Sequence, residues 1–139
     1  MPITVTAPEG TLTPTGEREI LPRLSAALIE ASGATGNSFF TSIVGGTVHL
    51  LPPRHIYAGG ANRPVVMVEL KLPNIGLGST EARNAFITAA AGIVAELCVP
   101  SHRPENTWIN IVNASDGGWG IGDQQYTGDQ LMAAAAAAH

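Results

Sequence analysis

The residue with the clearest chemical potential is Pro2, which follows Met1 and opens the apolar segment Pro2-Ile3-Thr4-Val5-Thr6. If Met1 is removed, Pro2 becomes a terminal secondary amine. An α-amino group has a pKa of about 7.7–8.0, and general base catalysis works best when the pKa lies near the working pH. The structural alternative is a strand-edge proline, tolerated because the first strand residue need not donate a hydrogen bond. Pro2 is therefore a candidate base whose role depends on loss of Met1.

The other reactive residue types add little. Cys98 lies within an apolar run over residues 93–99, which indicates a small buried hydrophobe rather than a reactive thiol. A single cysteine forms no internal disulfide, and no zinc site is implied. The seven basic residues are scattered and the net charge is −4, so nucleic-acid binding, which normally needs a basic stripe, is not expected.

Composition indicates one compact domain. The chain has 139 residues, of which 45% are hydrophobic and 13% charged. No apolar stretch is long enough to span a bilayer and the start lacks signal-peptide features, so we expect a soluble cytoplasmic protein. Because so few charged residues are available to solvate the surface of a lone domain, we expect other subunits to bury part of that surface. This favours an oligomer.

The elements that would position Pro2 form two β-α-β units. In the first unit, a strand over residues 2–6 precedes a helix over about residues 17–32, where Pro22 suggests a start later than Glu17. We predict a strand over residues 39–51, bent at Gly45-Gly46, and then a short hairpin over residues 56–60.

The second unit repeats this order. It has a strand over residues 64–70, a helix capped by Ser79 or Thr80 and running to about Val99, a strand over residues 107–112, and a glycine-rich segment over residues 117–122. The predicted fold is an α/β two-layer sandwich, with a four-stranded sheet and two helices on one face. We expect a single domain over residues 1–131, with an internal repeat (2–60 and 64–122), followed by a low-complexity tail over 132–139 to which we assign no function.

This pattern resembles the tautomerase superfamily. The terminal proline on a strand and Glu9-Gly10 after it are similar to 4-oxalocrotonate tautomerase. The segment over residues 48–60 and Trp108-Ile109-Asn110 are similar to macrophage migration inhibitory factor. The segment over residues 113–119, with Thr127-Gly128-Asp129 beyond it, is similar to malonate semialdehyde decarboxylase. The resemblance implies a cofactor-independent tautomerase in which Pro2 moves a proton in a 2-oxo acid or its enol. It also implies a homotrimer with active sites at subunit boundaries.

The departures from the family patterns concern cationic residues. Thr11 and His49 stand where 4-oxalocrotonate tautomerase has arginines, and Leu72-Pro73-Asn74 replaces the Arg-Pro-Arg of the decarboxylase. The decarboxylase aspartate falls on about Ser38. Specialised decarboxylase, dehalogenase or hydratase activity on a small unsaturated or 3-oxo acid remains an alternative function.

Seven residues are candidates for substrate binding, each with a structural alternative. Lys71 is a candidate for the cation that binds the substrate carboxylate, or else a solvated strand end. Arg54 and Arg63 flank the hairpin and are candidates for reaching the pocket of a neighbouring subunit, or else surface residues. His49 is a candidate substrate-binding residue or a satisfied core histidine. Asn110 corresponds to a ligand-contacting asparagine of the migration inhibitory factor family, or else forms cross-strand or subunit-edge hydrogen bonds. Pocket walls are the expected role of Tyr57 and Trp108, and of Trp119 as a further aromatic residue, each of which is otherwise a core or interface residue.

A third interpretation belongs to another class of protein. If Met1 is retained, the Pro2 nitrogen lies in a peptide bond and neither takes a proton nor attacks a carbonyl. The chain is then a non-catalytic binding or interaction protein with the same fold.

Overall fold

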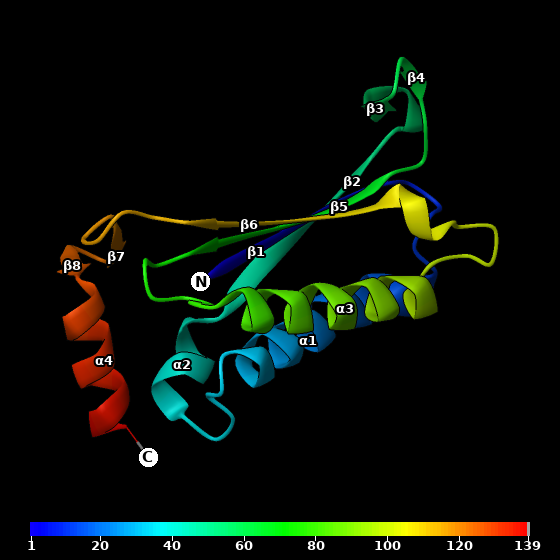
Figure 1. Cartoon of the computed structure of the whole chain (residues 1–139). Coiled ribbons are helices and arrows are strands. Elements are labelled where there is room, and N and C mark those ends of the chain that lie inside the picture. Colours follow the sequence, from blue (N-terminus) through cyan, green and yellow to red (C-terminus); the bar gives the residue numbers. More distant parts are fainter. Residues whose placement is uncertain (139) are drawn as a thin grey trace.

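The computed structural model describes residues 1–138. Its main sheet has the strand order β2-β1-β5-β6, formed by β1 (Pro2–Pro8), β2 (Gly45–Leu51), β5 (Val66–Leu72) and β6 (Thr107–Asn113). The pairs β1–β2 and β5–β6 are parallel, and β1 and β5 meet antiparallel at the centre. Helices α1 (Pro14–Ala31) and α3 (Thr80–Leu97) lie side by side on one face of this sheet (Figure 1). The predicted two-layer α/β fold is confirmed.

Strand alternation separates a buried face of the sheet from an open one. Ile3 and Val5 of β1 and Leu70 of β5 are fully buried beneath the helices, together with Leu24 of α1 and Phe86 of α3. The intervening residues point to the other face, which neither long helix covers. We call this second surface the open face; it carries Pro2, Thr4, Thr6, Thr47, His49, Met67, Glu69, Lys71, Trp108, Asn110 and Val112.

The first helix begins earlier than we predict from Pro22. The Thr13 side chain accepts a hydrogen bond from the backbone N–H of Gly16, and Pro14 occupies the first helical position. Proline suits that position because its missing N–H has no partner there in any helix. Pro22 lies inside α1 without ending it, so the expectation of a start after Glu17 is wrong.

The predicted strand over residues 39–51 is wrong in its first half. Residues Ser38–Ile43 form helix α2, and β2 starts only at Gly45. The Asn37 side chain caps α2 by accepting a hydrogen bond from the Phe40 N–H. This cap outweighs the strand preference of the two phenylalanines that follow it.

Two hairpins and a helix complete the chain. Strands β3 (Tyr57–Ala58) and β4 (Ala61–Asn62) form a hairpin beyond one end of the sheet, whereas β7 (Trp119–Ile121) and β8 (Gln124–Tyr126) lie at the other end (Figure 1). Short 3-10 turns cover Pro53–His55 and Pro104–Asn106. None of the helices within residues 1–138 is long and apolar enough to cross a membrane.

The last helix, α4 (Gly128–Ala137), packs on the rest of the chain. Thr127 and Gln130 form a capping box at its start, and Leu131 is fully buried. The Asn37 side chain donates a hydrogen bond to the Ala135 carbonyl at 2.9 Å. Helix α4 therefore runs across residue 131, where we expect the domain to end.

Cys98 behaves as a buried apolar residue. It follows α3, is 6% exposed, and burial raises the pKa of its thiol to about 11. Because the thiolate is the nucleophilic form, this thiol is unreactive near neutral pH.

Candidate functional site

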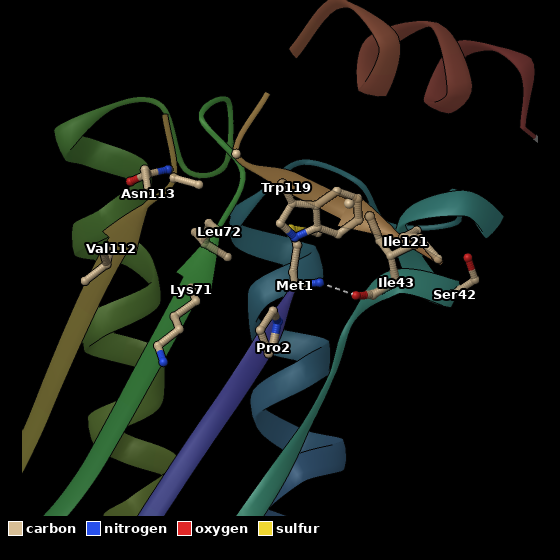
Figure 2. Close-up of a pocket in the computed structure, with 13 residues that line it drawn as sticks. Met1, Pro2, Ser42, Ile43, Lys71, Leu72, Val112, Asn113, Trp119 and Ile121 are labelled. Carbon is tan, nitrogen blue, oxygen red and sulfur yellow. Dashed lines mark hydrogen bonds between the residues drawn. The ribbon is translucent and has the colours of Figure 1, made fainter. Parts of the chain in front are cut away.

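A pocket of about 650 Å³ lies where the first strand begins (Figure 2). Adjacent ends of three main-sheet strands, helix α2 and the β7 strand contribute to its walls. Its lining residues are Met1, Pro2, Ser42, Ile43, Lys71, Leu72, Val112, Asn113, Ala114, Gly118, Trp119, Gly120 and Ile121. Lys71 is the one charged side chain among these residues, so the pocket is largely apolar.

The antiparallel register brings Lys71 beside Pro2. Ile3 is opposite Leu70 in the β1–β5 pair, so the same register continued by one residue places Pro2 opposite Lys71. Both residues are exposed on the open face, where directly opposite Cβ atoms are about 4.5–5.5 Å apart. Within residues 1–138, the ion pairs are Arg23–Glu96 and Arg103–Glu105, so the Lys71 ammonium has no carboxylate partner there.

Asn113 and Trp119 shape the pocket. The Asn113 side-chain amide donates to the Pro73 carbonyl at 2.9 Å and to the Gly76 carbonyl at 2.7 Å, which fixes the loop after β5. The Trp119 ring, half-buried on β7, makes an edge contact with Tyr126 at 5.8 Å between centroids. The Asn113 amide therefore holds the loop after β5, and Trp119 forms a wall of the pocket that packs against Tyr126.

Met1 occupies the space next to Pro2 in this structure. It is 5% exposed, and its α-amine donates a hydrogen bond to the Ile43 carbonyl (Figure 2). Burial disfavours the charged amine and lowers its pKa from 8.0 to about 6. The pocket therefore favours an uncharged amine at the chain terminus.

A chain that retains Met1 is expected to lose stability as the pH falls from 8 to 6. The folded amine, with a pKa of about 6, holds fewer protons in this range than the unfolded amine at 8.0, so stability rises with pH between those values. Thermal unfolding across this range measures the effect, and nitrogen NMR of labelled Met1 reports the pKa directly. An amine that titrates near 8 in the folded protein contradicts the described burial.

The remaining predicted binding residues lie away from Pro2 within one chain. At the far end of the sheet, the Arg63 Nε donates to Asn106 Oδ1 at 2.9 Å, and its guanidinium carbon lies 5.7 Å from the Trp108 ring centroid. Tyr57 is on the β3–β4 hairpin there and is 65% exposed, and Arg54 is in the turn before it.

Two predicted residues occupy intermediate positions on the open face. Asn110 is opposite Glu69, and His49 is opposite Thr6, with its Nε2 2.9 Å from Thr47 Oγ1. Of the seven predicted binding residues, Lys71 alone lines the pocket of Pro2 in the part of the chain that the structure describes, and Trp119, the further aromatic residue predicted for the wall, lines it too.

The sequence prediction does not include Ser42, Ile43 and Val112, which line the pocket. The sequence prediction places the first two in a strand, although Asn37 before Ser38-Phe39-Phe40 is a helix-cap signal. Val112 is opposite Lys71 in the β5–β6 register, which becomes predictable only once those strands are known to be parallel neighbours.

Comparison with known proteins rests on structure. No protein-family model and no curated protein matches the chain. Among solved structures, Pt0534 inactivated by 2-oxo-3-pentynoate is 22% identical, with a TM-score of 0.74 over 94% of this chain and 98% of that one. A symmetric trimer of wild-type fused 4-OT is 15% identical, with a TM-score of 0.76 over 94% and 98%.

Macrophage migration inhibitory factor of Toxoplasma gondii is also similar. It is 15% identical, and the TM-score is 0.69 over 91% of this chain and 100% of that chain. Identities this low establish architecture rather than activity. In its strand order, helix placement and coverage, the chain has the fold of the tautomerase superfamily.

Proposed function

We propose that the chain, after removal of Met1, is a cofactor-independent tautomerase that moves a proton in a 2-oxo acid or its enol. The observation that carries this proposal is the opposition of Pro2 and Lys71 in an apolar pocket. Pro2 supplies a terminal amine, and Lys71 supplies a cation with no carboxylate partner in the described chain. A small substrate with a carboxylate next to a carbonyl needs this pair of groups.

The proposed chemistry is a proton transfer without net change in composition. The Lys71 ammonium binds the substrate carboxylate, which places the neighbouring enol against Pro2. The free Pro2 amine takes the enol hydroxyl proton as the carbonyl forms, and the protonated amine returns a proton to the adjacent carbon. Burial lowers the pKa of the terminal amine in the chain that retains Met1, and we propose that the terminal amine of the processed chain is likewise desolvated once substrate fills the pocket. More of the amine is then in its basic form at neutral pH.

The composition of the pocket favours this function over hydration or dehalogenation. Hydration and dehalogenation require a group that activates water. Neither aspartate nor glutamate is among the described residues that line the pocket. Proton transfer by an amine requires no such group.

We also propose that three copies assemble through their open faces. This face and the β3–β4 hairpin expose large apolar side chains, with Trp108 at 38%, Val112 at 58% and Tyr57 at 65%. The structurally similar fused 4-OT forms a trimer. In such an assembly, the distal Arg54 and Arg63 belong to a surface that a neighbouring pocket can use. Sedimentation of the processed protein tests this, and a stable monomer contradicts it.

An electrophilic 2-oxo acid tests the proposed base. Pt0534 was inactivated by 2-oxo-3-pentynoate, whose alkyne accepts an amine by conjugate addition. Incubation of the processed chain is expected to abolish phenylpyruvate tautomerisation and add one inhibitor mass, which peptide mapping assigns to Pro2. Inactivation with the label on another residue, or full activity after incubation, argues against Pro2.

A further inference from the structure

Met1 lies between two hollows of the molecule. It lines the pocket of Pro2 and also a second hollow of about 220 Å³ deeper in the chain. The second hollow is lined mainly by apolar groups from α1, α2, α3, α4 and the loop after β5, including Ala31, Phe40, Leu77, Ala82 and Met132. The Met1 residue thus separates a surface pocket from an apolar recess.

Removal of Met1 opens this recess next to the reactive nitrogen. The Met1 carbonyl carbon is bonded to the Pro2 nitrogen, so the vacated space adjoins that nitrogen by covalent geometry alone. In Figure 2, the Met1 side chain extends from Pro2 away from the Lys71 ammonium. A ligand held by Lys71 therefore meets Pro2 first and the vacated space second.

The walls of this space resist collapse. They come from four helices and a loop that the two hydrogen bonds of Asn113 hold in place. In that loop, Leu77 is 3% exposed and has a φ of 45°, a left-handed conformation that is uncommon for a residue with a side chain. Such a conformation persists where the surrounding structure fixes it.

We propose that the space vacated by Met1, together with the recess behind it, binds an unbranched apolar substituent on C3 of a 2-oxo acid. The Met1 side chain, a straight apolar chain, shows the shape that fits. The inference rests on the proposed function for the removal of Met1 and for carboxylate binding at Lys71. Its substrate class is 2-oxo acids with a linear alkyl or thioether tail, in preference to pyruvate.

Calorimetric binding of a chain-length series tests this subsite. For the processed protein, affinity is expected to rise about fourfold with each methylene from pyruvate to 2-oxohexanoate, as burial of apolar groups dictates. Equal affinity along the series overturns the proposal. Calorimetry measures binding and does not depend on turnover. Equal affinities along the series therefore contradict the subsite but not the role of Pro2. Affinities that rise along the series in a protein without turnover contradict the proposed function but not the subsite.

Two forms of the protein in which a side chain fills this space serve as controls. Ala82→Leu extends a side chain into the recess from α3 and is expected to remove the gain for longer acids while leaving pyruvate binding unchanged. The matched variant Ala91→Leu, on an exposed position of the same helix, is expected to keep the full gain. In the chain that retains Met1, the Met1 side chain itself occupies the proposed subsite. If the affinity of that chain rises with the length of the acid as steeply as that of the processed chain, the subsite is contradicted, even if Ala82→Leu fails to fold.

Discussion

Pro2→Ala is expected to lower kcat/KM for the enol–keto conversion of phenylpyruvate by about 10²–10⁴-fold, the usual contribution of a positioned general base. The substitution replaces a secondary amine held in a ring with a primary amine that rotates freely about its N–Cα bond. Position 2 is exposed at the start of β1 and contributes nothing to the buried core, so the fold should persist. Absorbance at the enol band measures the rate, and circular dichroism confirms folding.

Pro14→Ala is the matched control for this variant. Pro14 is exposed at the first position of α1 and lies outside the pocket, so the same chemical change there should leave turnover unaltered. Unchanged turnover in Pro2→Ala, with both proteins folded and free of Met1, rules out Pro2 as the base.

Lys71→Gln is expected to weaken substrate capture by about 10- to 100-fold, which corresponds to the loss of one charge-assisted hydrogen bond of about 1.5–3 kcal/mol. The effect should appear mainly in KM, because Lys71 binds the carboxylate in the ground state and the transition state alike. A glutamine at this exposed end of β5 keeps a polar side chain that is one atom shorter than lysine, so stability should change little.

Two further variants separate charge at this site from charge in general. Lys71→Arg keeps the cation and is expected to recover most of the affinity. Arg83→Gln removes the same charge from an exposed position on α3, away from the pocket, and should leave KM unchanged. A KM for Lys71→Gln equal to that of the unmodified chain shows that another group binds the carboxylate.

The sequence predicts the parts of the fold that repeat with a regular period. The apolar runs at β1 and β5 indicate buried strands, and the Ser79 cap with the helical spacing of Phe86, Ala90 and Ile93 indicates α3. These signals are local, and tertiary packing agrees with them. The pairing of Pro2 with Lys71 was not predictable in the same way, because it depends on the antiparallel register of strands from different halves of the chain.

The sequence prediction is wrong or incomplete where a short local signal, such as a helix cap, competes with the residue composition of the segment. Phe39 and Phe40 favour a strand by residue type, but the Asn37 cap and the contacts of α2 with α4 hold them in a helix. The alanine run near the end suggests low complexity, although Thr127 and Gln130 cap a helix whose Leu131 is fully buried. Helices α2 and α4 both border the region around Met1, so the recess beside Met1 was not predictable from the sequence.

The most direct test of Pro2 compares two preparations of the same chain. One has an intact mass that lacks Met1, and the other keeps Met1 because its aminopeptidase was inhibited during expression. Their rates of phenylpyruvate tautomerisation are then measured side by side. We predict turnover only in the chain without Met1, because only there is the Pro2 nitrogen an amine. Equal turnover by the two preparations contradicts a catalytic Pro2.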